Sequence, residues 1–565
     1  MLGENKFKIL LDLIDNATKD ELIWMNGYLN GVVKSKAGST APEAVAPPLV
    51  NKITIVYGTE TGNSKRLATD FAARAKKKSI HAKVIGMDQY RLDDLQKEEF
   101  LLAVVSTHGE GEPPIAAKKF YDHIHKNGFK LDKLKYSVLA LGDTSYPLYC
   151  KTGEEVDEQL NKLGGKRIAP LQKCDVEYDD DANFWFNSVL ENLSTTVSPA
   201  PAIVSPARAA PKKGKQVYTG RVMTSINLND RGSDKNTYHI ELQADNVQYQ
   251  CGDSIGIVPN NPTAEVEAIL TTVKADGNKK LLFKNEEVSI YDLLKHKINI
   301  IHLTERLVKQ YAETVQQEIP AARMNLLDLL RIYPVKDAQQ FEEIICKLNA
   351  VSPRLYTIAS SPSSHPDEVH ILAVKDIYQV NDETKFGLCS NYLAQLEENS
   401  EQQFFIQPNK RFRLPAENKD IIMVGPGTGI AAFRSFLAER DATGASGRNW
   451  LFFGEQHFVS DFLYQTEIQS WFETGVLTKV NLAFSRDQKE KIYVQHKMLQ
   501  HAAELYSWLQ AGASFFICGK KDPMSHDVEK TLLTIIEQQG NKTSEEAKKY
   551  LEQLEEEGRF EKDVY

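Results

Sequence analysis

Two kinds of hydrophobic pattern alternate in the first half of the chain. Short apolar runs such as ITIVYG (53–58) and FLLAVVST (100–107) are separated by stretches with helical spacing, for example RLATDFAARAKKK (66–78). The runs HAKVIGM (81–87) and YSVLALGD (136–143) extend the series. Strands that alternate with helices predict a parallel sheet covered on both faces. Such a sheet binds ligands in the loops beyond the carboxyl ends of its strands.

The pattern changes after about residue 216. VYTGRVMTSINLN (217–229) and NTYHIELQ (236–243) alternate between apolar and polar positions, which predicts antiparallel strands. The region 263–350 has mostly helical spacing, and RLYTIASS (354–361) and EVHILAV (368–374) return to strand. We therefore expect an antiparallel β-barrel with a helical insertion.

Strand–helix alternation resumes near residue 419. IIMV (421–424), NWLFFGE (449–455), VNLAFSR (480–486) and SFFICGK (514–520) are the expected strands. A second α/β domain follows from this pattern, so the fold class is multidomain α/β.

Two stretches rich in Ala, Pro and Ser divide the chain, because they hold too few large apolar residues to fold. We predict a helical segment, a linker, a first α/β domain, a flexible linker, the barrel domain and a second α/β domain. The helical segment covers 1–34, its linker 35–50 and the first α/β domain 51–195. The flexible linker covers 196–215, the barrel domain 216–415 with the insertion at about 263–350, and the second α/β domain 416–565.

The N-terminal segment KFKILLDLIDNATKDELIWMNGYLNGVV is amphipathic. Thr18 and Glu21 have the spacing of a capping box at the start of a second short helix. Two interpretations stay open. The helices can pack on the next domain, or they can form an oligomerisation element, because a long linker separates them from that domain.

Composition narrows the class of protein. The formal net charge of −9 argues against nucleic acid as the main partner, since phosphate neutralisation needs a basic surface. We see no apolar run of membrane-spanning length and no signal-peptide pattern, so we expect a cytoplasmic protein without a membrane partner. The six cysteines form no C-x-x-C pair and no Cys/His cluster, so we expect no metal ligation.

The turn TETGNS follows the first expected strand and opens a helix. Hydroxyls and backbone N–H groups at a helix N-terminus suit a phosphate. The turn lacks both the Walker lysine and G-x-G-x-x-G, so a mononucleotide phosphate held by neutral donors fits best. The candidate residues are Thr59, Glu60, Thr61, Gly62, Asn63 and Ser64.

Two more loops, STHGEGEPP and LGDTSYPLYC, follow later strands. Their glycines allow a flat ligand to approach the backbone, and Tyr146 and His108 can stack on its two faces. One such loop is as often a solvated turn, whereas three in order are a specific signal. The candidate residues are Ser106, Thr107, His108, Gly109, Leu141, Gly142, Asp143, Thr144, Ser145, Tyr146, Tyr149 and Cys150.

These three loops resemble those of flavodoxin-type FMN domains. The resemblance implies that the first loop binds the FMN phosphate and that the other two enclose the isoalloxazine ring. The chain departs from microsomal relatives, which usually carry Tyr at the position of His108.

Two motifs near the C-terminus suit a dinucleotide. GPGTGIAAFR (425–434) follows a strand, but alone it is weak because many strand–helix connections look similar. In SRDQKEKIYVQ (485–495), a hydroxyl, a guanidinium and an ammonium group can meet one 2′-phosphate, and Tyr493 can stack on a base. The alternative for the second motif is a solvated charged loop. Together the two motifs favour NADPH over NADH.

Two further motifs lie in the expected barrel. RLYT (354–357) places a cation, an aromatic ring and a hydroxyl on one strand, and GLCS (387–390) precedes a helix whose N-terminus suits a pyrophosphate. Either motif alone could be core or turn.

All four motifs together resemble the ferredoxin–NADP reductase superfamily, with Thr357 and Ala432 in place of the usual Ser and Pro. The resemblance implies FAD in the barrel and NADPH at the glycine-rich turn. The implied FAD residues are Arg354, Leu355, Tyr356, Thr357, Leu372, Ala373, Val374, Tyr378, Gly387, Leu388, Cys389, Ser390 and Tyr565. The implied NADP residues are Gly427, Thr428, Gly429, Ser485, Arg486, Lys491, Ile492, Tyr493, Val494, Gln495 and Asp527.

The same resemblance implies a function for the C-terminal sequence KDVY. In this superfamily a C-terminal aromatic covers the FAD ring and must move before nicotinamide can stack. A hydroxyl, a thiol and a carboxylate align hydride transfer. The matching catalytic positions are Thr357, Cys518, Asp563 and Tyr565. Without the resemblance, Cys518 would be an ordinary buried cysteine at a strand end.

The order of an FMN domain, a linker and an FAD/NADPH module resembles the diflavin reductases. This implies electron transfer from NADPH through FAD and FMN to a one-electron acceptor. LIWMNGYLNG (22–31) and the DVY terminus are most similar to the flavoprotein components of bacterial assimilatory sulfite reductases. That resemblance implies a homo-oligomer formed through the N-terminal segment. It also implies a hemoprotein beta-component with siroheme and a 4Fe–4S cluster, which reduces sulfite to sulfide for cysteine biosynthesis.

Two alternatives stay open. One is a diflavin reductase for another one-electron acceptor, such as a soluble heme monooxygenase. The other is a redox-inert flavin-binding scaffold or sensor. The retained set Thr357, Cys518, Asp563 and Tyr565 argues against the second alternative, because a sensor has no need for hydride-transfer groups.

Overall fold

The computed structural model describes residues 50, 52–59, 62–108, 111–126, 128–143, 146, 148–175, 178–194, 216–320, 324–380 and 383–565. The predicted N-terminal helical segment, its linker apart from Val50, and the linker at 196–215 lie outside these residues.

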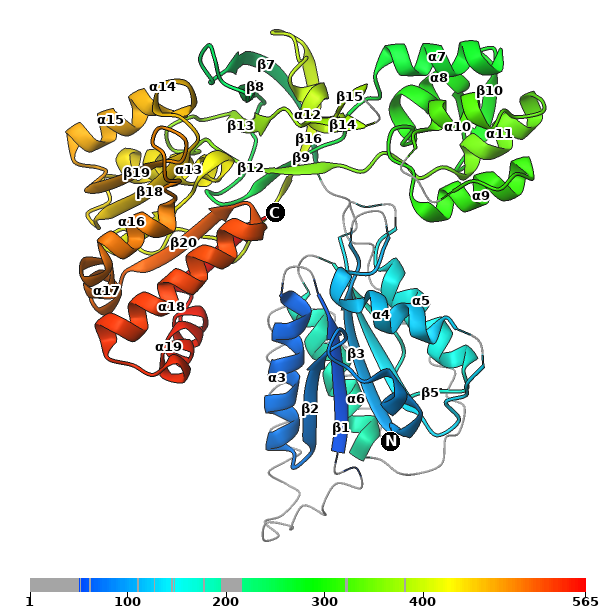
Figure 1. The fold of residues 1–565 in the computed structure, drawn as a ribbon, viewed down its shortest axis with the longest axis horizontal. Coiled ribbons are helices and arrows are strands. Elements are labelled where there is room, and N and C mark those ends of the chain that lie inside the picture. The colour runs from blue at the N-terminus through cyan, green and yellow to red at the C-terminus, as the bar shows by residue number, and fades with distance from the viewer. Residues whose placement is uncertain are drawn as a thin grey trace, which may run out of the picture.

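The first domain is the expected parallel sheet (Figure 1). Its main strands are β1 (Lys52–Gly58), β2 (His81–Gly86), β3 (Phe100–Ser106) and β4 (Lys135–Leu141). The strand order is β2-β1-β3-β4-β5, with β5 (Lys166–Arg167) at the edge and the short β6 (Gln172–Cys174) paired to β4. Because β1, β3 and β4 are parallel neighbours, the loops that follow them meet at one edge of the sheet.

Helices cover both faces of this sheet, as the sequence predicted. The helices are α3 (Asn63–Lys77), α4 (Ile115–Ile124), α5 (Lys151–Lys162) and α6 (Asp179–Ser194). Phe71 of α3 and Trp185 of α6 pack with Leu102 and Leu139 on one face. Phe120 of α4 and Leu160 of α5 pack on the other face. The two apolar layers fix the sheet between them, which positions the three loops.

The predicted barrel is a six-stranded antiparallel sheet in the order β12-β9-β16-β7-β8-β13. Its strands are β7 (Val217–Asn227), β8 (Thr237–Gln243), β9 (Ser254–Ile257), β12 (Arg354–Thr357), β13 (Glu368–Val374) and β16 (Glu401–Gln407). An isolated bridge between Ile358 and Ile371 brings the two ends of the sheet together. The sequence did not predict β9 and β16, which are a four-residue strand and a strand with little alternation.

The insertion at 263–350 has its own apolar core. It contains α7 (Thr263–Val273), α8 (Ile290–Asp292), α9 (Glu305–Val315), α10 (Leu326–Ile332), α11 (Ala338–Lys347) and the hairpin β10 (Lys280–Phe283) and β11 (Glu286–Ser289). The hairpin departs from the helical prediction for this region. After β13 the barrel domain adds the hairpin β14 (Ile377–Val380) and β15 (Glu383–Phe386), and then α12 (Leu388–Leu393).

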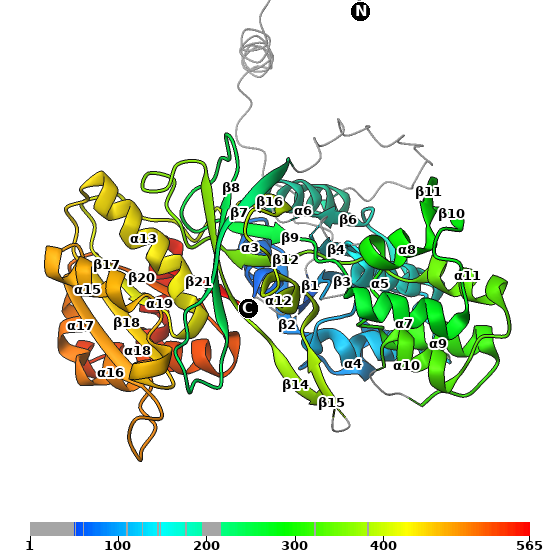
Figure 2. The ribbon, with the colours of Figure 1, turned by 90° about the horizontal axis from the view of Figure 1, so that it is seen from above.

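The last domain is a five-stranded parallel sheet in the order β19-β18-β17-β20-β21. Its strands are β17 (Ile421–Val424), β18 (Asn449–Glu455), β19 (Lys479–Phe484), β20 (Ser514–Gly519) and β21 (Phe560–Val564). Its helices are α13 (Ile430–Thr443), α14 (Phe458–Asp461), α15 (Gln465–Thr474), α16 (Val494–Gln500), α17 (Ala502–Gln510), α18 (His526–Gly540) and α19 (Ser544–Glu556). The C-terminal tail forms the edge strand β21, and Figure 2 shows the C-terminus beside the barrel.

Candidate flavin and coenzyme sites

The first loop of the flavodoxin-like domain fits a phosphate. Gly62 lies just before α3 with φ of 92°, and its backbone N–H donates to Thr59 Oγ1 over 2.9 Å. Ser64 is fully buried, and its Oγ has no hydrogen-bond partner among the described residues. An unpaired buried hydroxyl costs about 1–3 kcal/mol, so a ligand oxygen at this place would satisfy it. Glu60 and Thr61 lie outside the described residues.

The described residues of this loop, Thr59 and 62–64, include no cationic side chain, and Lys65 and Arg66 follow in α3. The nearest arginine, Arg66, donates to Tyr178 Oη and to Asp179 Oδ1 over 3.1 and 2.8 Å. The guanidinium charge is therefore engaged by the acidic start of α6. A phosphate held by hydroxyl and backbone donors stays a prediction for this loop.

The second and third loops lie beside the first, at the ends of β3 and β4. They are tied to each other, because the N–H of Thr107 donates to Leu141 O over 2.9 Å. At Gly142 an added Cβ would lie 2.8 Å from the backbone N of Cys150, so only glycine allows this close approach. Tyr146 is half-buried, and His108 is exposed. Gly109, Thr144 and Ser145 lie outside the described residues.

One candidate in the third loop lies under the loop. Cys150 is fully buried, and its thiol donates to the backbone oxygen of Ala140 over 3.3 Å. Burial raises the pKa of this thiol to about 11. Its side chain therefore belongs to the core, and only its backbone is left to face a ligand.

The proposed FAD residues divide between the surface and the core of the barrel. Leu355, Val374 and Tyr378 are 37–40% exposed. Leu372 and Ala373, which precede Val374 in β13, are buried. Ser390 Oγ accepts from the backbone N–H of Asp376 over 3.1 Å and donates to Gly387 O over 3.2 Å. The GLCS turn is thereby tied to the chain between β13 and β14.

The glycine-rich turn at 427–429 is pressed against β20. Gly427 has φ of 61°, and a Cβ on Gly429 would lie 2.0 Å from the backbone oxygen of Cys518. Both positions require glycine. The turn is a short 3-10 helix that leads directly into α13.

The candidate 2′-phosphate residues follow β19. Arg486 is half-exposed, and its Nη1 lies 3.5 Å from Asp234 Oδ2. A surface ion pair of this kind contributes little to the stability of the fold. Lys491 and Tyr493 are exposed, and Tyr493 directly precedes α16. Gln495 Nε2 donates to Asp527 Oδ2 over 3.5 Å. These side chains are available to a ligand, whereas Val494 is buried.

The four predicted catalytic residues come together where the last sheet meets the barrel. Thr357 Oγ1, at the end of β12, donates to Asp563 Oδ2 over 2.7 Å. The thiol of Cys518 lies 3.9 Å from the same carboxylate oxygen. Burial raises the pKa of both Asp563 and Cys518 above their ordinary values. Tyr565 follows on the same tail, and its Oη lies 2.6 Å from Thr428 Oγ1.

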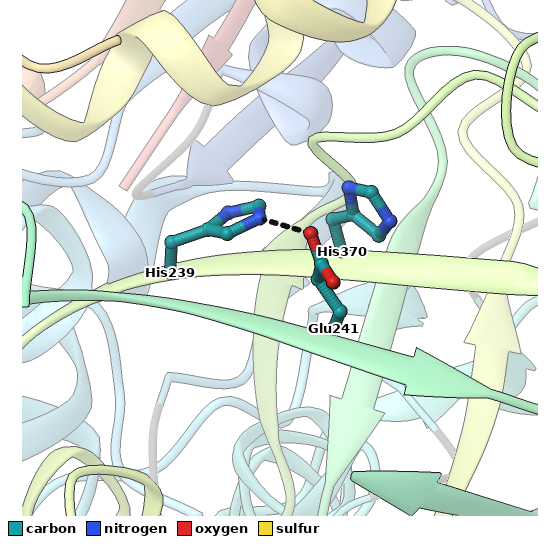
Figure 3. A group of neighbouring side chains, drawn as sticks. All are labelled: His239, Glu241 and His370. Atoms are coloured by element: carbon teal, nitrogen blue, oxygen red, sulfur yellow. Dashed lines mark hydrogen bonds and ion pairs between the residues drawn. The ribbon is translucent and has the colours of Figure 1, made fainter. Parts of the chain in front are cut away.

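The structure also reveals a histidine cluster that the sequence analysis missed (Figure 3). Ligand atoms of His239, Glu241 and His370 lie within 4.8 Å of one another, a spacing that could hold a metal. The ring nitrogens of His239 are engaged by Tyr464 Oη at 2.9 Å and by Glu241 Oε1 at 3.1 Å. Those of His370 are engaged by Arg434 Nη1 at 2.9 Å and by Glu368 Oε2 at 3.0 Å.

The guanidinium group of Arg434 makes this cluster unsuitable for a metal cation. Burial and the guanidinium charge of Arg434 lower the pKa of His370 to about 2, so the ring is neutral. A second cation beside the guanidinium would be repelled. The cluster therefore acts as a polar joint between the barrel strands β8 and β13 and the helix α13 that carries the GPGTGIAAFR motif. No local sequence motif predicts this cluster, since its members lie on separate elements.

Comparisons with known proteins agree with this architecture. Residues 55–185 match the flavodoxin family, residues 210–315 and 302–392 match the FAD binding domain, and residues 423–530 match the oxidoreductase NAD-binding domain. None of the helices in the described ranges has the length and apolar character that a bilayer crossing demands. The fold and these matches define an oxidoreductase with FMN, FAD and nicotinamide-coenzyme domains.

Full-length relatives define the family. The sulfite reductase (NADPH) flavoprotein alpha-component of Bacillus subtilis is 40% identical, covering 100% of this chain and 98% of the relative. The protein of the same name from Vibrio cholerae serotype O1 is 36% identical and covers 100% of this chain and 96% of the relative. The one from Shewanella sp. strain MR-4 is 37% identical and covers 100% of this chain and 98% of the relative. The chain belongs to the family of sulfite reductase flavoprotein alpha-components.

Proposed function

We propose that this protein transfers electrons from NADPH through FAD and FMN to a hemoprotein that reduces sulfite to sulfide. The observation that carries the proposal is the meeting of Thr357, Cys518 and Asp563 at the junction of the barrel and the coenzyme domain. In a chain of this family, such a junction is where a hydride passes from nicotinamide to flavin. The bound coenzyme and flavins supply the hydride and electron chemistry.

The chain's own groups position that transfer. The Asp563 carboxylate accepts from the Thr357 hydroxyl, which ties the tail strand β21 to the barrel strand β12. The buried Cys518 thiol, with its raised pKa, stays protonated and neutral beside the carboxylate. Thr357 and Asp563 therefore link the two domains by a hydrogen bond, with the Cys518 thiol beside them.

We assign the FMN phosphate to the loop 59–64 and the FMN ring to the loops that follow β3 and β4. The buried, unpaired Ser64 hydroxyl and the close approach at Gly142 support this assignment. We assign FAD to the RLYT and GLCS motifs. We assign the coenzyme pyrophosphate to Gly427, Thr428 and Gly429, and its 2′-phosphate to Ser485, Arg486 and Lys491.

The partner and the assembly state are parts of the same proposal. The relatives are named as a flavoprotein component, which supports a hemoprotein partner carrying siroheme and a 4Fe–4S cluster. We further propose that the N-terminal segment 1–34 forms a homo-oligomer, that the linker 196–215 lets the FMN domain reach its partners, and that the protein is cytoplasmic.

The electron path has a direct test under anaerobic conditions. NADPH should bleach the absorbance of both flavins, and the reduced protein should then pass electrons to cytochrome c. A chain depleted of FMN should still lose its FAD absorbance but should not reduce cytochrome c. Failure of NADPH to bleach FAD would refute the proposal. Cytochrome c reduction at full rate without FMN would refute the order of the two flavins.

A further inference from the structure

A buried carboxylate lies beside the glycine-rich turn. Glu455 is the last residue of β18 and is 8% exposed. A Cβ on Gly427 would lie 3.6 Å from Glu455 Oε1, so the carboxylate faces the turn to which we assign the coenzyme pyrophosphate. The N–H of Ser485 donates to Glu455 O, and the N–H of Arg486 donates to Gln456 O, both over 2.9 Å. Glu455 is therefore next to both proposed phosphate sites.

A lone carboxylate at this position would oppose the coenzyme. The pyrophosphate of a nicotinamide dinucleotide carries two negative charges. Like charges repel each other, and the repulsion grows where protein replaces water. An unpaired Glu455 would therefore weaken the binding of every nicotinamide coenzyme, with or without a 2′-phosphate.

Lys235 supplies the opposite charge from the barrel domain. Its Nζ lies 2.8 Å from Glu455 Oε1 and 2.7 Å from Oε2, so it contacts both carboxylate oxygens. The Glu455 side chain is 3% exposed and the Lys235 side chain 29% exposed, so water screens this pair much less than a surface pair. Seen from the glycine-rich turn, the two charges cancel.

The loop that carries Lys235 is fastened to the coenzyme domain. Asn229 Nδ2 and Ser233 Oγ donate to Asp461 Oδ1 over 2.9 and 2.5 Å, and Asp461 is fully buried. Ser233 Oγ also accepts from the backbone N–H of Lys235 over 3.0 Å. The backbone of Lys235 is therefore held in place by contacts that do not involve Glu455.

We propose that Lys235 and Glu455 act as one neutral unit in the coenzyme site, in which Lys235 cancels the repulsion between the Glu455 carboxylate and the pyrophosphate. The inference rests on the proposed coenzyme site, and it adds two residues that lie outside the motifs of that site. Lys235 acts through Glu455 and is a positioning residue. Because NADP+ and NAD+ share the pyrophosphate, the pair affects both coenzymes alike.

Three variants test the pair: Lys235→Met, Glu455→Gln and the double variant. Oxidised NADP+ and NAD+ are titrated calorimetrically into each flavin-loaded protein. We expect Lys235→Met to raise the Kd for both coenzymes about tenfold, because the carboxylate is left unpaired. Glu455→Gln should lower both Kd values about five-fold, because the ammonium group is no longer cancelled. The double variant should return to within about two-fold of the starting protein.

Lys479→Met is the matched control, because Lys479 pairs with Glu504 at the other end of β19 in the same domain. It should leave both Kd values unchanged. A purely structural role for Lys235 would also lower stability, but the added Glu455→Gln change would then not restore affinity. The rescue in the double variant therefore separates the electrostatic role from a structural one.

Two results would overturn the neutral pair. An unchanged or raised Kd in Glu455→Gln would show that the carboxylate does not repel the coenzyme. A double variant as weak as Lys235→Met would show that Lys235 binds the coenzyme itself. Arg486→Ala reports on the proposed coenzyme site separately. If Arg486→Ala weakens NADP+ binding and the pair variants do not, only the present inference fails. If Arg486→Ala has no effect either, the proposed coenzyme site fails with it.

Discussion

The three loops proposed to bind FMN and the proposed hydride-transfer junction are built in opposite ways. All three FMN loops leave one sheet at one edge, and each is a continuous stretch of sequence. The junction brings together Thr357, Cys518 and Asp563 from three strands, and its central hydrogen bond joins residues 206 positions apart. The loops carry glycines and a half-buried aromatic, whereas the junction is a closed set of hydrogen-bonded polar groups.

This difference matches the two tasks of an electron-transfer protein. A misplacement of about 1 Å can slow such a transfer about 100-fold, which suits the proposed hydride-transfer groups being held between two domains. Single electrons can pass to a partner across an exposed flavin edge, which suits the proposed exit site in loops on a separate domain. Changes at the junction should therefore affect the rate of reduction, and changes in the loops should affect flavin retention.

The largest effect is expected for Asp563→Asn. The amide keeps the shape but loses the charge that accepts from Thr357, so the alignment of the two domains suffers. We expect the rate of FAD reduction by NADPH to fall about 100-fold in stopped-flow measurements, with both flavins retained. The exposed Glu557, just before β21, provides the control variant Glu557→Gln. A rate within two-fold of the starting protein would remove Asp563 from the catalytic set.

Arg486→Ala should have the next largest effect. Loss of a charge-assisted contact to the 2′-phosphate should raise the Kd for NADPH by about 30-fold and leave the Kd for NADH nearly unchanged. Arg448→Ala is the control, because Arg448 is another surface arginine paired to a carboxylate, Asp420, in the same domain. Equal losses for both coenzymes would contradict the 2′-phosphate assignment.

Ser64→Ala should produce two effects of opposite sign. The FMN-free protein should become more stable by about 1 kcal/mol, because a buried unpaired hydroxyl is removed. The Kd for FMN should rise about five- to tenfold, while FAD content stays constant. Thr69→Ala, on the exposed side of the same helix, should change neither quantity. If FMN affinity is unaffected, the phosphate does not contact Ser64.

The smallest effect concerns Glu561, two residues before Asp563. Burial, partly offset by the charge of Arg411, raises the pKa of this half-buried carboxyl to about 7. The folded state thus favours the protonated acid. Its contribution to stability is complete below about pH 4.5 and is lost as the pH rises through 7.

Glu561→Gln should remove this pH dependence. After a discount for partial exposure, we expect the variant to be about 1 kcal/mol more stable than the starting protein at pH 8. The two should be nearly equal at pH 4.5. Urea unfolding at the two pH values measures the difference. Parallel stability curves for both proteins would show that the Glu561 carboxyl does not titrate near 7.

The sequence predicted much of this architecture because its signals are local. The strands of the two parallel sheets follow from continuous apolar runs such as FLLAVVST and NWLFFGE, and the structure confirms them. The short β9 was missed because four residues are too few to show a strand-like alternation of apolar and polar positions. The edge strand β21 was missed because its sequence FEKDV is mostly polar.

The same distinction holds for the sites. TETGNS, GPGTGIAAFR and SRDQKEKIYVQ are local motifs that could be found by reading the chain. The cluster of His239, His370 and Arg434 could not be found, because tertiary packing alone brings these residues together. The buried positions of Cys150, Leu372 and Ala373 likewise required the fold, since their motifs do not show which side chains face inward.

The central claim is that electrons from NADPH leave this protein to reduce sulfite. The most direct test combines the flavin-loaded chain with the siroheme hemoprotein from the same organism and measures NADPH consumed and sulfide formed under anaerobic conditions. Six electrons per sulfite and two per hydride predict about three NADPH for each sulfide. Cytochrome c reduction without any sulfide would contradict the claim and assign the protein to another electron acceptor.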